Sequence, residues 1–71
     1  MADIDQDKVE EQLSKAIDKV LEGIEEFNDA ANKLIKANVY SGTYVNTLNQ
    51  RRIKFTKLQM KLILFKDEYS L

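Results

Sequence analysis

The chain has 71 residues, of which 44% are apolar and 32% charged, with a formal net charge of −1 and no histidine, cysteine or proline. Because cysteine and histidine are absent, disulfides, thiolate metal sites and the commonest general base are excluded. A chain of this length forms at most one small domain, 1–71, which is marginally stable unless regular helix packing or a partner chain supports it.

A first amphipathic helix is predicted for about residues 6–37. Its apolar residues recur in alternating steps of four and three, which is the spacing of a heptad seam. Asp7 near its start and Lys36 near its end complement the helix dipole. Gly23 interrupts the pattern, and we interpret it as a point where a neighbouring helix approaches closely, with a kink in the helix as the alternative. The predicted seam residues are Leu13, Ile17, Val20, Ile24, Phe27, Ala31 and Leu34.

The only turn-like cluster follows in the stretch ANVYSGTYVN. We expect Gly42 to take the left-handed conformation that closes a helix or a tight turn. Either Ser41 or Thr43 is expected to cap the next helix. The sequence therefore places the chain reversal at about residues 39–43.

A second helix is predicted for about residues 44–67, with a seam of the same spacing. Two seams of similar length joined by a short connection predict an all-α, antiparallel two-helix hairpin. Residues 1–37 hold ten acidic and five basic residues, whereas residues 38–71 hold six basic and two acidic residues, which favours this pairing. The predicted seam residues are Tyr44, Leu48, Arg51, Phe55, Leu58, Leu62, Phe65 and Tyr69.

Arg51 is the one charged residue of the second seam. We expect it to set register or partner specificity, with Asp29 as the nearest acidic candidate across the hairpin. The alternative is that its guanidinium extends outward into water along its apolar stem.

The stretch LQMKLILF is apolar nearly all round a helix. One hairpin cannot bury two faces, so we predict that a partner or a second copy completes a helical bundle over the extra face. The alternative is that the last turns fray and these side chains rest loosely on the hairpin. The predicted partner-binding residues are Ile53, Met60, Ile63 and Leu64.

The sequence contains no catalytic triad, no zinc motif and no glycine-rich phosphate loop, so we expect no enzyme, no metal and no cofactor. No apolar run approaches the roughly 18 residues of a membrane span, and the acidic N-terminus is unlike a signal peptide. We expect a cytoplasmic protein that uses no membrane as a partner, although export without a leader stays open.

The stretch YSGTYVNTLNQ places a glycine just before a second helix that starts with an aromatic residue. Together with the acidic start and the two heptad helices, this layout resembles the small hairpin co-chaperones of bacterial type III secretion. It resembles the needle subunits of that system more distantly. The resemblance implies a chaperone-like role and assigns no functional residues.

The expected function is a small protein-interaction module, adaptor or chaperone-like, that buries an apolar helix of a partner protein. The alternative is a self-assembling structural subunit, either a homodimeric four-helix bundle or needle-like. Nucleic-acid binding comes third, because five basic residues lie within residues 51–61. The sequence pI of about 5.3 and the acidic first helix argue against that third role.

Overall fold

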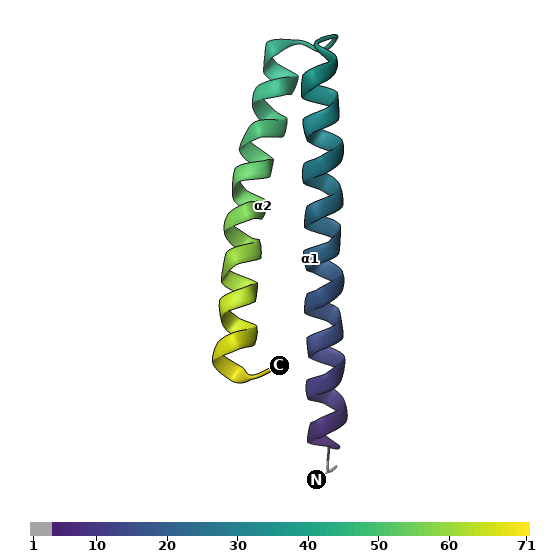
Figure 1. The fold of residues 1–71 in the computed structure, drawn as a ribbon, viewed down its shortest axis with the longest axis vertical. Coiled ribbons are helices and arrows are strands. Elements are labelled where there is room, and N and C mark those ends of the chain that lie inside the picture. Colours follow the sequence, from purple (N-terminus) through teal and green to yellow (C-terminus); the bar gives the residue numbers. More distant parts are fainter. Residues whose placement is uncertain (1–3) are drawn as a thin grey trace.

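In the computed structural model, which describes residues 4–71, the chain forms two antiparallel α-helices that lie side by side (Figure 1). Helix α1 spans Gln6–Ala37 and helix α2 spans Gly42–Tyr69. The predicted all-α hairpin is confirmed. Helix α2 begins two residues earlier and ends two residues later than the sequence pattern predicted, and the hairpin measures 56 × 20 × 19 Å.

Short polar side chains set the start of each helix. The Asp5 carboxylate accepts a hydrogen bond from the Lys8 backbone N–H at 3.3 Å, and the Ser41 hydroxyl accepts one from the Tyr44 N–H at 3.3 Å. Each bond satisfies a backbone donor that has no partner within its helix. Of the two caps considered for α2, Ser41 is therefore the one used.

Asn38 rather than Gly42 carries the left-handed conformation in the connection. Asn38 has φ 56° and closes α1, whereas Gly42 has no positive φ and is the first residue of α2. The expectation for Gly42 is therefore wrong. Asparagine tolerates this conformation better than most residues because its short polar side chain can hydrogen-bond locally.

The core between the helices is thin. Within residues 4–71 the buried side chains are Ile17, Ile24 and Ala31, with 5%, 5% and 2% of their surface exposed. They are seven residues apart and form one line along α1. The apolar side chains that are half-buried against this line are Leu21, Phe27, Leu34, Ile35, Val45, Leu48, Phe55 and Leu62.

Three side-chain contacts across the hairpin define its register. The Phe27 and Phe55 rings meet at a centroid distance of 4.9 Å. The Asn28 amide donates to the Thr56 hydroxyl at 3.4 Å, and the Lys66 ammonium pairs with the Asp18 carboxylate at 2.5 Å. The residue numbers of two positions that face each other across the hairpin therefore add up to about 83.

Not every predicted seam residue lies in this contact. The exposed apolar members of the predicted seams are Leu13, Val20, Tyr44, Leu58, Phe65 and Tyr69. On α2 the half-buried positions instead include Val45, Arg52, Gln59 and Lys66, alternating with the predicted Leu48, Phe55 and Leu62. Because α2 is apolar around much of its circumference, its apolar residues do not determine how the helix is rotated about its own axis. The side of α2 that faces α1 is therefore partly polar.

Candidate functional site

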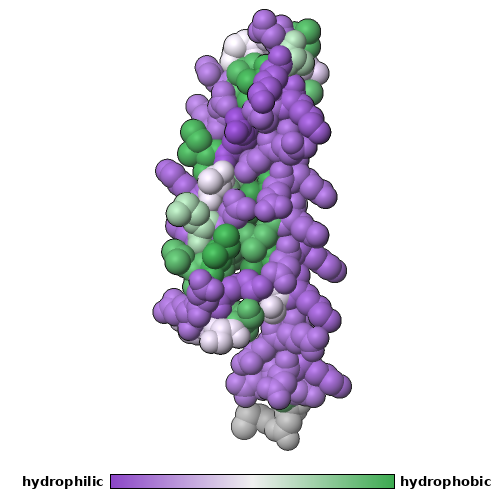
Figure 2. All heavy atoms as spheres, viewed as in Figure 1, coloured by the Kyte–Doolittle hydropathy of each residue, from purple (hydrophilic) through white to green (hydrophobic). Residues whose placement is uncertain are grey.

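One exposed apolar surface occupies a side of α2. Ile53, Met60, Ile63 and Leu64 keep 44–64% of their surface exposed. Counted from Thr56, they lie at −3, +4, +7 and +8 along α2, which places them on the same side of the helix as Thr56. This is the side on which the Thr56 hydroxyl accepts the hydrogen bond from Asn28. We call these four residues the Met60 patch. Figure 2 shows apolar side chains gathered over the C-terminal half of α2 on the face in view.

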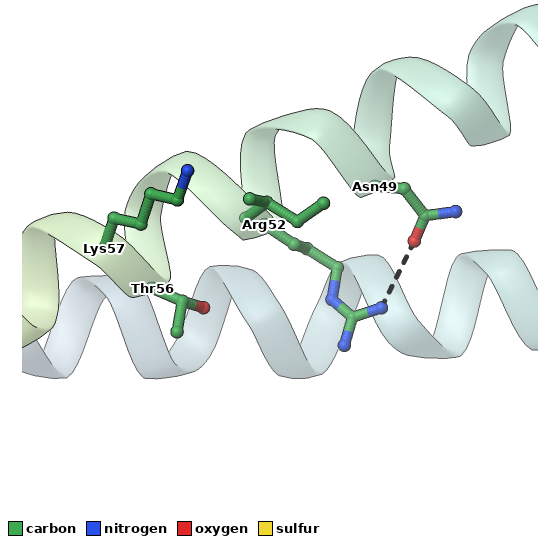
Figure 3. Close-up of a pocket in the computed structure, with 5 residues that line it drawn as sticks. Asn49, Arg52, Thr56 and Lys57 are labelled. Carbon is green, nitrogen blue, oxygen red and sulfur yellow. Dashed lines mark hydrogen bonds between the residues drawn. The ribbon is translucent and has the colours of Figure 1, made fainter.

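A shallow depression of about 350 Å³ lies at the Ile53 end of the Met60 patch. Figure 3 shows that Arg52 extends its guanidinium across toward α1 beside Asn49. An Arg52 terminal N–H donates to the Asn49 side-chain oxygen at 3.4 Å, but the buried Nε has no partner. Because it is buried, this Nε is out of reach of a group in the depression, and a carboxylate or carbonyl entering there would meet the terminal guanidinium N–H groups instead. The lining residues are Asn49, Arg52, Ile53, Thr56 and Lys57.

The arginine that enters the helix contact is Arg52, one position after the predicted Arg51. Arg51 is exposed and makes no ion pair with residues 4–71. Asp29, its expected partner, pairs with Lys33 on its own helix at 2.9 Å. The cause is the rotation of α2, since one residue along a helix moves a side chain by about 100°.

A second exposed apolar surface lies on the opposite side of the hairpin. Except for Val9, which precedes Leu13 by four, these residues follow a contact residue by three positions or precede one by four, as Val20 precedes Ile24 and Leu58 follows Phe55. Both spacings rotate a side chain by about 40–60° in the same sense. In an antiparallel pair, equal rotations on the two helices point to one common side. The set, which we call the Phe65 face, comprises Val9, Leu13, Val20, Leu58, Phe65 and Tyr69, with 38–61% of their surface exposed.

Sequence reasoning placed five of these six residues on or beside the helix seams and did not recognise them as a surface. The available signal was the width of the apolar stripes. A stripe wider than the line that one neighbouring helix covers leaves a flank for a second neighbour.

The balance of charged residues differs between the two helices. Helix α2 carries six basic and two acidic residues, and α1 carries eight acidic and five basic residues. Lys54, Lys57 and Lys61 are exposed and form no ion pair with residues 4–71. Arg51 and Arg52 point to other sides of α2, so the five basic residues do not form a single stripe.

Three acidic side chains do not come together as a metal site anywhere in residues 4–71. Neither described helix has a stretch that is long and apolar enough to cross a bilayer. Comparisons with protein-family models, curated proteins and solved structures find no match. The resemblance to secretion co-chaperones therefore stays one of layout.

Proposed function

We propose that the hairpin is a protein-interaction module, adaptor or chaperone-like, that buries an apolar helix of another protein against the Met60 patch. The observation that supports it is the exposure of four large apolar side chains on one side of α2. Fully burying such a side chain contributes about 1.5–3 kcal/mol, so covering the exposed part of four contributes several kcal/mol. Contiguous exposed apolar residues usually mark an interaction site.

The charges beside the Met60 patch indicate the chemistry of the partner helix. Lys57 lines the depression together with Ile53, and Lys61 lies one turn further along α2. A helix with apolar residues spaced by three and four, and with carboxylates on the flank next to these lysines, complements the surface. A carboxylate or side-chain carbonyl near its end would also accept from the terminal guanidinium N–H groups of Arg52, which lines the depression.

Two other roles have less support. For nucleic-acid binding, the basic residues are dispersed around α2 and the eight acidic residues of α1 lie on the neighbouring helix. We propose no catalytic role.

The cytoplasmic location expected from the sequence stays a prediction.

Site-specific photocrosslinking in cells tests the proposal. A photoreactive benzoyl-phenylalanine replaces Met60 in one variant and Lys33, on α1, in a matched control. We expect one defined heteromeric adduct from position 60 only, whose crosslinked peptide maps to an amphipathic helix of the partner. Leu64→Asp should abolish it. Equal adducts at both positions, or an adduct only with a second copy of the chain, would refute the proposed function.

A further inference from the structure

The apolar stripes of the two helices point to a common side of the hairpin rather than directly at each other. On α1, positions from Val9 to Leu34 in steps of four and three carry no charged side chain, and this line runs beside the buried line of Ile17, Ile24 and Ala31. On α2, Leu58, Phe65 and Tyr69 occupy the corresponding flank together with the exposed Arg51, which lies three positions after Leu48 and four before Phe55. Apolar stripes that point to a common side are expected when each helix packs against two neighbouring helices, as in a four-helix bundle.

Small residues lie along the same flank of α1. Ala16, Gly23 and Ala30 alternate there with Val20 and Phe27. A Cβ added at Gly23 would meet nothing within 4 Å, so α2 of the same chain does not use the space that this glycine leaves. The close approach inferred from the sequence at Gly23 is therefore available to a helix of another chain.

The exposed surface of the hairpin is large for its mass. Its accessible area is 5949 Å². A compact monomer of 8.2 kDa exposes about 4,500 Å². The excess of about 1,400 Å² exceeds the roughly 800 Å² that each partner buries in a specific protein interface of standard size.

We propose that the Phe65 face is covered by a second copy of the chain, giving a four-helix bundle whose twofold axis runs parallel to the helices. In this arrangement α1 of one copy lies beside α2 of the other, so the acidic helix meets the basic one at both new contacts. A twofold axis across the helices would instead stack α1 on α1 and α2 on α2, which places like charges together. Charge therefore selects the parallel axis.

The hairpin register also fixes the register of the dimer. A rotation about the long axis keeps every residue at its own height, so Val20 of one copy lies near the height of Phe65 of the other. Leu58 and Leu13 continue the same interleaved line above and below them. The Met60 patch lies on the opposite side of the hairpin and takes no part in this dimer, so partner binding and dimer formation can be lost independently.

Sedimentation equilibrium across a wide range of concentrations gives the first test. We expect a dimer in the unmodified chain, and we expect Val20→Glu with Leu58→Glu to raise its dissociation constant by about 30-fold or more. The matched control, Met60→Glu with Leu64→Glu, should leave the dimer unchanged. A monomer at all concentrations, or a dimer disrupted only by the control pair, would overturn the proposal.

Disulfide trapping tests the axis without relying on a destabilised variant. The chain has no cysteine, so Val20→Cys and Phe65→Cys chains can be mixed, unfolded together, refolded and oxidised. We expect the mixed disulfide as the main product. The control mixture, Glu25→Cys with Met60→Cys, has matched heights on the opposite side and should give none. Predominance of disulfides between identical chains would contradict the parallel axis.

Discussion

Phe27 of α1 and Phe55 of α2 meet edge to face across the middle of the hairpin, with ring centroids 4.9 Å apart and an interplanar angle of 85°. This is the favoured geometry for two aromatic rings, because the positive edge of one faces the negative face of the other. The pair lies between the levels of Ile24 and Ala31, in a core with three buried side chains among the described residues. Its two rings are therefore a large part of the contact.

Phe55→Ala should lower the free energy of unfolding by about 2–3 kcal/mol, somewhat less than for a fully buried phenylalanine. Phe27→Ala should have a similar effect, and the double variant should reveal a coupling of about 0.5–1.5 kcal/mol between the rings. Urea unfolding followed by circular dichroism at one fixed protein concentration measures both. Ile53→Ala on the exposed side of α2 is the control, with a change within about 0.5 kcal/mol. An equal loss in the control would show that the aromatic pair has no special weight.

The connection between the helices predicts opposite effects at its two candidate turn residues. Gly42→Ala should raise the free energy of unfolding by about 0.4–1 kcal/mol, because φ is ordinary there and a Cβ meets nothing within 4 Å. Asn38→Val should lower it by about 1–2 kcal/mol, since a β-branched residue is strained at φ 56°. Thermal unfolding compares the two variants. Asn38→Gly, which relieves that strain, should stay close to the unmodified chain, and a loss there would mean that the asparagine side chain matters more than its backbone conformation.

The two candidate caps of α2 can be separated by alanine. Ser41→Ala should cost about 1 kcal/mol, because the Tyr44 N–H loses its 3.3 Å hydrogen bond. Thr43→Ala should be neutral or slightly stabilising, since Thr43 lies within the first turn and alanine is the better helix former. Helicity and urea midpoints of both variants measure the difference. A larger loss at Thr43 would contradict the assignment of Ser41 as the cap.

The sequence predicts the helices and their pairing because those depend on patterns that extend over many residues. The same hairpin is favoured by three features: heptad spacing over about three heptads, opposite net charges on the two helices, and a single turn cluster between them. The rotation of α2 depends on much less. Leu58 and Gln59 are neighbours in sequence, and a rotation by part of one residue decides which of them faces α1.

The same uncertainty in the rotation of α2 explains which exposed apolar residues the sequence separates from the seam and which it does not. Met60 and Leu64 differ clearly from the seam in spacing, so the sequence separates them from it, and both are exposed. Val20 and Phe65 satisfy the seam spacing, yet they lie on its flank. In a four-helix bundle the apolar stripe of each helix is centred between two neighbours, so a seam read from sequence points toward the bundle axis rather than toward the first neighbour.

Arg52 is half-buried in the helix contact, and we expect its replacement by an apolar residue to stabilise the hairpin. Its side chain is half-buried, its Nε has no partner and its hydrogen bond to Asn49 is 3.4 Å long. Methionine keeps the length of the stem and removes the desolvated charge, so Arg52→Met should raise the free energy of unfolding by about 1 kcal/mol. Urea unfolding at fixed concentration measures it, with Lys54→Met on the exposed side as the control within about 0.5 kcal/mol. A loss of stability in Arg52→Met alone would show that the guanidinium already has its partners in the isolated hairpin. A gain accompanied by weaker partner binding would identify Arg52 as a residue kept for recognition, at a cost to the fold.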